Sequence, residues 1–467
     1  MRGVAGTAPT PNVAWTPPAS SRQAAPQALP PGLPPDLAAR IAQLTLTDVI
    51  DIALRNNTAT SAAWADARSA AASYGAAKGQ YFPIIALDGT AQAIKRIASG
   101  GVGAAKQQSF GPGLNVSWLL LDFGGRSGSI GEAREALLAA DWTHNATLQT
   151  VVLTVQQAYF LYMGTKALVV AERTTLTEAQ TNLGAAEQRH RVGLATIADV
   201  LQARTALSQA RLALESTEGD LQTTRGALAL SMGLPANVPY DIEVLPDTTV
   251  PLGIIDSVDT LIARAVRERP DLAAQRALAE QARARVSVAR SQALPSLSVG
   301  GTASQTYFVH NPPASTPPAG NSYNATLTLS IPIFSGWSQI YTVKAASAAA
   351  DAAALRANGF EQQVVYQVFN GYYALRTSTQ QVRTSRDLLA SATESEQVAL
   401  GRYKAGAGSL LDLLTAQAAL ASARAQAIQA RFSWNTALAQ LAHDVGILGL
   451  DGSSPLRMQT DTTGTGR

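Results

Sequence analysis

Residues 148–183 read LQTVVLTVQQAYFLYMGTKALVVAERTTLTEAQTNL, and every seventh position in this stretch is apolar. These positions are Leu148, Val155, Tyr162, Val169, Leu176 and Leu183. After a short break, a second series with the same spacing follows at Val200, Leu207, Leu214, Leu221 and Leu228. A sustained seven-residue apolar repeat predicts long helices that pack side by side, as in coiled coils.

Both series return 213 residues further along the chain. The first recurs at Val368, Leu375, Val382 and Leu389, and the second at Leu413, Leu420, Ala427, Trp434 and Leu441. Within each half, glycine permits a chain reversal between the series, and a Thr-x-x-Asp or Ser-x-x-Asp capping box then restarts the helix. The chain is therefore predicted to contain two helical hairpins made by duplication, with helices at 126–189, 196–232, 337–402 and 409–446.

A shorter helix is expected before each hairpin. The first begins near Leu44 with Thr47 as its cap and ends near Gly79, and its counterpart extends from Ser257 to Gln292. The Gln, Pro and Gly-Thr-Ala residues that follow these helices stand at one constant offset, so the duplication includes this part of the chain as well.

After each of these helices the apolar period changes from helical to two, which is typical of strands. In the clearest case Tyr323, Ala325, Leu327 and Leu329 alternate with Asn, Thr and Ser. Strands are predicted at 82–92, 113–122, 295–308 and 323–334, with solvent-facing loops at 98–111 and 310–321. About ten residues of alternating polarity is the length of a tilted β-strand that crosses a bilayer.

The predicted organisation follows from these elements. It comprises a Pro-rich N-terminal linker at 1–43, a first repeat at 44–232, an inter-repeat linker at 233–256, a second repeat at 257–446 and a flexible C-terminal tail at 447–467.

Four strands with one apolar and one polar face cannot form a closed wall by themselves. An open sheet would leave unpaired backbone groups in hydrocarbon, and known membrane barrels have at least about eight strands. The fold class expected is therefore mainly α with a membrane β-barrel contribution, completed by several copies of the chain. A soluble coiled-coil scaffold is the contrasting alternative, but it leaves the apolar faces of the strands unexplained.

The composition excludes several other classes of function. Net charge is +3 and no basic run occurs, so nucleic acid is not an expected partner. The absence of cysteine excludes thiol catalysis, Cys-based zinc sites and an N-terminal lipidated Cys. The four histidines are scattered and no nucleophile motif occurs, so neither an enzyme nor a metal or other cofactor is expected. No signal peptide is visible after Met1.

The sequence resembles the TolC family of outer-membrane efflux proteins, the outer membrane factors, over about residues 44–446. The resemblance rests on motifs in a fixed order: Tyr81-Phe82-Pro83, Leu121-Asp122-Phe123-Gly124-Gly125-Arg126, Val192-Gly193-Leu194-Ala195-Thr196, Ile331-Pro332-Ile333-Phe334-Ser335-Gly336 and Arg402-Tyr403-Lys404-Ala405-Gly406. It implies a homotrimer with a twelve-stranded barrel among the lipids of the Gram-negative outer membrane and a helical tunnel in the periplasm. It also implies a periplasmic adaptor, an inner-membrane pump of the RND or ABC type, and efflux of small molecules. Within the family the alternative is the outer-membrane duct of a type I protein secretion system.

The resemblance also suggests three groups of functional residues. The hairpin turns would contact the adaptor through Arg189, Gly193, Thr196, Arg402, Tyr403 and Gly406, although these glycines and basic residues also suit a simple turn. The periplasmic aperture would involve Leu411, Asp412 and Thr415, where Thr415 replaces an Asp common in relatives and Asp412 is also the capping residue. Gly124, Gly125, Ser335 and Gly336 would bend the backbone between barrel and tunnel.

Overall fold

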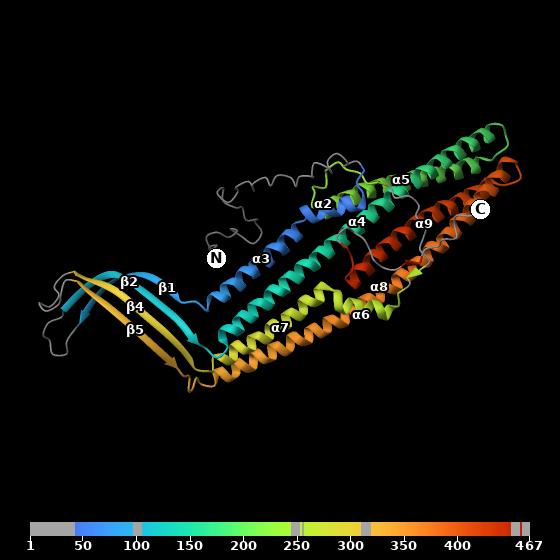
Figure 1. The fold of residues 1–467 in the computed structure, drawn as a ribbon. Coiled ribbons are helices and arrows are strands. Elements are labelled where there is room, and N and C mark those ends of the chain that lie inside the picture. The colour runs from blue at the N-terminus through green and yellow to red at the C-terminus, as the bar shows by residue number, and fades with distance from the viewer. Residues whose placement is uncertain are drawn as a thin grey trace, which may run out of the picture.

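The computed structural model describes residues 43–96, 105–243, 253–254, 256–309, 319–449 and 458–459. The chain is elongated, with a four-stranded sheet at one end and two helical hairpin turns at the other (Figure 1). The predicted N-terminal linker at 1–43 lies outside the described residues except for Gln43.

Four long helices form the body of the molecule: α4 (Gly125–Arg191), α5 (Ile197–Ser231), α8 (Ser338–Lys404) and α9 (Leu410–Val445). Each begins and ends within two residues of the bounds predicted from the apolar repeat. Helices α4 and α8 have 67 residues each, which corresponds to about 100 Å at 1.5 Å per residue. The repeat positions face inward, since Val155, Val368, Leu375 and Leu413 are completely buried.

The shorter helices are interrupted, which corrects the prediction of one continuous helix in each half. The first consists of α2 (Leu46–Asn56) and α3 (Thr58–Gly79), and the second of α6 (Val258–Glu268) and α7 (Pro270–Ser291). The cap of α2 is Thr45 and not Thr47, because Thr45 forms a capping box with Asp48. The breaks occur at Asn57, which is extended and caps α3, and at Arg269, which precedes a proline.

The helices lie in the same lateral order along the whole molecule. Near the sheet the order of contacting helices is α3–α4–α7–α8, and near the hairpin turns it is α5–α4–α9–α8. Helix α5 ends beside the start of α3, where Gly233 contacts Asn56 and Asn57, and α9 ends beside the start of α7, where Gly446 contacts Arg269. The helices of one chain therefore form four parallel columns. Two columns are single long helices, α4 and α8, and each of the other two consists of two helices placed end to end.

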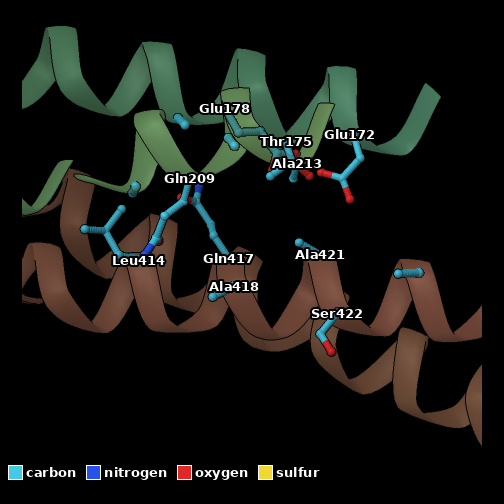
Figure 2. A pocket seen from close by; sticks show the side chains of 14 residues that line it. Glu172, Thr175, Glu178, Gln209, Ala213, Leu414, Gln417, Ala418, Ala421 and Ser422 are labelled. Atoms are coloured by element: carbon cyan, nitrogen blue, oxygen red, sulfur yellow. The ribbon is translucent and has the colours of Figure 1, made fainter. Parts of the chain in front are cut away.

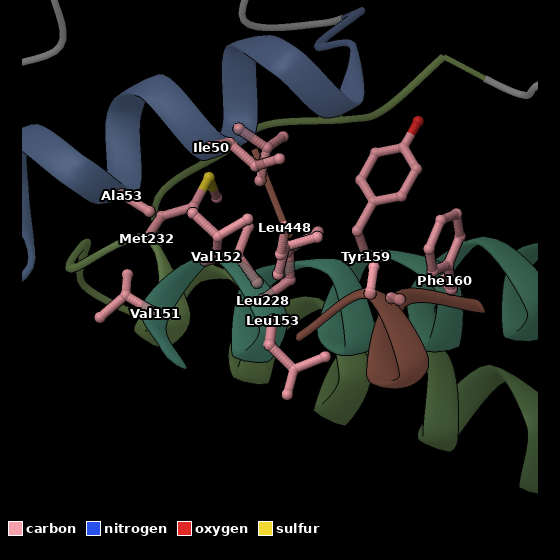
Figure 3. Packing of buried hydrophobic residues seen from close by; sticks show 14 of the residues in the cluster. Ile50, Ala53, Val151, Val152, Leu153, Tyr159, Phe160, Leu228, Met232 and Leu448 are labelled. Atoms are coloured by element: carbon pink, nitrogen blue, oxygen red, sulfur yellow. The ribbon is translucent and has the colours of Figure 1, made fainter. Parts of the chain in front are cut away.

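The main hydrophobic core lies near the middle of the molecule, where the two helices of each composite column meet end to end. Figure 3 shows Ile50 of α2, Val152 and Tyr159 of α4, Leu228 of α5 and Leu448 converging there. Leu448 and Ile447 belong to the predicted flexible tail but are buried, and Met458–Gln459 (β6) pairs with Gly253–Ile254 (β3). The prediction of a flexible tail is therefore wrong at Ile447, Leu448, Met458 and Gln459, because their apolar side chains or backbone groups have partners in the fold. The rest of 450–467 lies outside the described residues.

The sheet has the order β1–β2–β4–β5, with every neighbouring pair antiparallel. Its strands are β1 (Ile84–Arg96), β2 (Ala105–Leu121), β4 (Ser296–Val309) and β5 (Ala319–Ser330). Strand β2 begins earlier than predicted and includes residues assigned to a loop at 105–111. Strand β5 ends before Ile331 and Ile333, because Pro332 cannot donate to a ladder.

The register of the strands gathers the apolar residues on one face. Leu87 lies opposite Leu114, Ile85 opposite Val116, Trp118 opposite Val299 and Val299 opposite Leu327. The alternating positions form the other face, where Asn115 lies opposite Thr302 and Thr302 opposite Asn324. The period-two pattern therefore continues across all four strands, and the apolar face is solvent-exposed in the single chain, with Leu87 78% exposed. Among the described residues, no helix is apolar and long enough to cross a bilayer.

Candidate functional site

Both hairpin turns have the same backbone construction. Leu194 N–H donates to the carbonyl of Arg189 and Gly193 N–H to that of His190, at 2.8 and 3.0 Å. Ala407 and Gly406 repeat these two bonds in the second turn. Gly193 (φ 79°) and Gly406 (φ 72°) are left-handed, as this helix ending requires.

A capping box then starts the next helix in each hairpin. Thr196 and Asp199 exchange hydrogen bonds in the first, and Ser409 and Asp412 in the second. The side-chain and backbone hydrogen bonds of Ser409 lower the pKa of Asp412, so this exposed carboxylate remains ionised at neutral pH. Thr196, Gly193 and Gly406 are therefore residues that build the turns and are also exposed at the end of the molecule.

Arg189 and Tyr403 connect the two turns. The guanidinium of Arg189 lies over the Tyr403 ring, 4.1 Å from its centroid, and donates to the Tyr403 carbonyl at 3.0 Å. Tyr403 is only 7% exposed, whereas Arg402 beside it is exposed. Arg189 and Tyr403 border a groove of about 520 Å³ between the turns, to which Leu194, Asp199, Gly406 and Ser409 also contribute. In the single chain, Arg189 and Tyr403 thus hold the hairpins together, while Arg402 and Gly406 lie open to a partner.

Further polar contacts follow the seam between the hairpins toward the middle of the molecule. Asn182 of α4 donates to Gln417 of α9 at 2.5 Å, and Glu178 of α4 pairs with Arg424 of α9 at 3.3 Å. A cavity of about 320 Å³ lies beside them between α4, α5 and α9 (Figure 2). Half of its lining residues are alanine, and burial raises the pKa of Glu172 at its edge. This seam could not be predicted from the sequence, because its pairs join residues 235 and 246 positions apart.

The aperture candidates lie on the first turns of α9. Leu411 is 57% exposed, Asp412 is exposed within its capping box, and the exposed Thr415 hydroxyl donates to the Leu411 carbonyl. All three side chains are exposed in the single chain.

The strand–helix junctions at 121–126 and 331–337 each contain two consecutive left-handed residues. These are Phe123 and Gly124 in the first junction and Gly336 and Trp337 in the second. Gly124 and Gly336 thus have the backbone conformation that suits a bend, whereas Gly125 is needed for space, because a Cβ there would lie 2.7 Å from Ser291 Oγ. Ser335 is exposed and does not have a left-handed conformation itself.

Arg126 fastens the first junction and was not singled out as a site residue. Its buried guanidinium donates to the carbonyls of Leu119 and Leu120 at 2.5 and 3.0 Å and lies 4.8 Å from the Tyr81 ring centroid. Its Nε lies 3.4 Å from a carboxylate oxygen of Asp122. The Asp and Arg four residues apart at a helix start were the available signal.

Arg269 fastens the break between α6 and α7 and was also missed. Its guanidinium is bidentate to Asp271 and donates to Gln367 of α8 at 2.7 Å and to the Asp444 carbonyl of α9 at 3.2 Å. Burial acts to raise the pKa of Asp271, but the hydrogen bonds and charge of Arg269 outweigh it and the pKa lies below its usual value. No cluster of metal-ligating side chains occurs within the described parts of the chain.

Comparison with known proteins decides the family. The sequence model of the family described as outer membrane efflux protein matches residues 49–234 and 261–446, one match in each half of the duplication. The chain belongs to this family. It is therefore an efflux channel protein of the kind found in the outer membrane of Gram-negative bacteria. The family consists of channels and not of enzymes.

Relatives of this outer membrane efflux protein span nearly its whole length. Protein CyaE of Bordetella pertussis is 30% identical over 447 residues, covering 94% of this chain and 92% of that protein. The probable efflux pump outer membrane protein TtgC of Pseudomonas putida is 25% identical over 417 residues, covering 86% and 82%. The outer-membrane channel OprN superposes with a TM-score of 0.75 at 20% identity, covering 87% and 90%, which supports the fold.

Proposed function

We propose that three copies of this chain close into one channel that conducts small molecules from a periplasmic adaptor and an inner-membrane pump across the outer membrane. The observation that carries the proposal is the sheet, one face of which is apolar and the other polar. Within the described residues, its edge strands β1 and β5 each pair with one strand only. Hydrocarbon tolerates such a sheet only when every edge is paired. Three sheets of four strands supply twelve strands, enough to surround a passage.

The closure can be tested with disulfides, because the chain contains no cysteine. Thr90→Cys on β1 is combined in turn with Thr326→Cys or Thr328→Cys on β5, all on the polar face. Under mild oxidation, at least one of these cysteine pairs is expected to form disulfides between chains and to give covalent dimers and trimers. Thr90→Cys with Thr302→Cys is the control, since β2 separates these strands within one chain. Only monomers from every pair, together with no conductance in lipid bilayers, would overturn the proposal.

The hairpin turns are proposed as the adaptor-contacting surface, with the exposed Arg402 and Gly406 as its centre. Arg402→Glu reverses the charge of an exposed side chain, and Gly406→Leu places a bulky residue where φ is 72°. Both are expected to abolish transport in cells while cross-linked trimers remain. The exposed Gly401→Ala in the neighbouring helix is the control, since nothing lies within 4 Å of the added methyl. Normal transport by both turn variants would remove this role.

Asp412 is proposed to contribute charge at the aperture, with Leu411 and Thr415 beside it. Three copies would place three ionised carboxylates at the far end of the tunnel. Asp412→Ala is expected to lower the preference for cations in bilayer recordings, and Thr415→Ser is its neutral control. Unchanged selectivity would leave Asp412 with its capping role alone.

Small-molecule efflux is favoured over protein secretion by the relatives named for efflux pumps. Deletion of the gene is expected to sensitise the host to several classes of small toxic compound and to leave the proteins of the culture medium unchanged. Loss of one exported protein with unchanged drug resistance would indicate the secretion function instead.

A further inference from the structure

The sheet carries one isolated charge within its body, Asp88 of β1. Strands β4 and β5 contain no charged residue, and β2 contains only Lys106. The other charged residues of β1, Lys95 and Arg96, stand at the loop end of the strand, where Lys95 lies opposite Lys106. In the described strands, Asp88 is therefore the sole residue that is charged at neutral pH between the loop end and the junction with the helices.

Asp88 belongs to the polar face of the sheet. It stands between Leu87 and Gly89, and Leu87 is paired with Leu114 on the apolar face. Since successive residues of a strand face opposite sides, Asp88 shares its side with Ala86 and Thr90 and with Asn115 of the neighbouring strand. The contact confirms this, because the Asn115 amide donates a hydrogen bond to the Asp88 carboxylate. Asp88 itself is exposed in the single chain.

Between the loop end and the helix junction, the rest of this face is neutral. Around Asp88 it consists of Asn115, Ser117, Thr302, Ser304, Asn324 and Thr326. These side chains can replace water around a permeating ion or molecule but do not distinguish anions from cations by charge. A single carboxylate per chain therefore determines the electrostatic character of this wall.

We infer that Asp88 forms a ring of three carboxylates inside the barrel and makes this level of the passage selective for cations. The inference rests on the proposed function, since only a closed trimer converts one carboxylate per chain into a ring. The apolar face meets lipid in a membrane barrel, so the polar face that carries Asp88 lines the lumen.

The dimensions of a twelve-stranded barrel make such a ring effective. Strands about 4.8 Å apart and tilted by about 40° give a backbone radius of about 12 Å. Inward side chains bring the carboxylates to about 8 Å from the axis, which is one Debye length at 0.15 M salt. Three charges at that distance change the energy of a monovalent ion by about RT after screening, favouring cations and disfavouring anions.

The cations at the loop end do not cancel this effect. Arg96, at an even position of β1 like Asp88, stands eight residues from it, which is about 26 Å of strand and more than two Debye lengths. The candidate aperture at Asp412 lies at the opposite end of the molecule, beyond the full length of the helices. The Asp88 ring therefore acts as a second, independent selective element in series.

The test is the reversal potential of single channels in planar bilayers under a KCl gradient centred near 0.15 M. Asp88→Asn, which keeps the shape and the contact with Asn115, is expected to lower the potassium-to-chloride permeability ratio about five-fold. The difference should disappear near 1 M salt, where the Debye length falls to about 3 Å. Thr90→Ser is the matched neutral control on the same face and is expected to match the unaltered channel.

A relocated charge distinguishes electrostatics from a change in barrel structure. Asp88→Asn combined with Thr90→Asp moves the carboxylate by two residues on the same face and is expected to restore the cation preference, and Thr90→Asp alone to increase it. An Asp88→Asn channel with unaltered selectivity, or a relocated charge that restores nothing in a conducting channel, would overturn the inference. Absence of any conductance from the unaltered protein would instead overturn the proposed trimeric channel.

Discussion

Removal of the Arg269 guanidinium is expected to loosen the joint between α7, α8 and α9. The side chain of Arg269 is 4% exposed, and its partner Asp271 is 30% exposed. Arg269→Met keeps an apolar side chain of similar length but leaves the Asp271 carboxylate without its cation. It also removes the hydrogen-bond donor to Gln367 and to the Asp444 carbonyl. Breaking one side of a buried ion pair costs about 3–5 kcal/mol, and the partial exposure of Asp271 reduces this to about 2–4 kcal/mol.

Hydrogen exchange measures this loss locally, without requiring the whole protein to unfold. The amides of Gly446 and Ile447 donate to His443 and Ala442 at 2.8 and 3.0 Å, directly beside Arg269. At about 1.4 kcal/mol for each tenfold, peptides that cover 440–448 should exchange roughly 30- to 1000-fold faster in Arg269→Met.

Arg264 provides the matched control on helix α6. It pairs with Glu268 at 2.8 Å, but both side chains are about one third exposed. Such pairs contribute about 0.3–0.5 kcal/mol, so Arg264→Met should change exchange by only about two-fold. Equal exchange in the two variants would refute the reasoning.

Acid provides a second measurement on the same joint. Because the pKa of Asp271 is lowered in the folded protein, its stabilising contribution is complete above the unfolded pKa of about 3.9 and is lost as the pH falls through the lower folded pKa. The unaltered joint should therefore open progressively below about pH 4, whereas Arg269→Met should lack this dependence. The double variant with Asp271→Asn should be less damaged than Arg269→Met, since no carboxylate remains stranded.

Three other predictions concern single residues. Thr196→Ala removes a capping side chain worth about 1 kcal/mol, so hydrogen exchange of amides at the first hairpin turn should be about five-fold faster. An unchanged exchange rate would show that backbone hydrogen bonds alone hold the turn. Gly446→Ala should lower the melting temperature, because φ at this position is 80° and the new Cβ would lie 3.0 Å from Arg269. Gly401→Ala is the control, since nothing lies within 4 Å of its new Cβ. Equal melting temperatures of the two variants would contradict backbone strain at Gly446. Burial raises the pKa of Tyr159 and of Tyr162 to about 12, so the stability of the fold should fall as the pH rises above about 10. Absorbance at 295 nm should show late-titrating phenols, of which one is lost in Tyr159→Phe and another in Tyr162→Phe. Titration of both at pH 10 would contradict their burial.

Periodic features could be predicted because their signal is repeated many times. The seven-residue series that contains Val155 and Val368 placed the ends of the long helices within two residues. The glycines at 193 and 406 and the capping boxes after them were predicted because each turn type admits few residue types. Capping chemistry was misread at Thr45, where a neighbouring threonine two positions later offered an equally plausible cap.

Features that depend on a single long-range contact could not be predicted. Arg189 and Tyr403 were both selected as partner-contacting residues, and no local pattern shows that they stack on each other. Arg269 and Asp444 are 175 residues apart and meet only because α9 ends beside the start of α7.

The sequence by itself determined the duplication, the helical and strand segments, and the alternation of polarity along each strand, because all three are local or periodic properties of the chain. Only the tertiary structure decided the register that gathers Leu87, Leu114 and Leu327 on one face and leaves Asp88 on the other. A shift of one residue between strands would reverse those faces, and strand order and register are determined by pairing across long separations that no local pattern records.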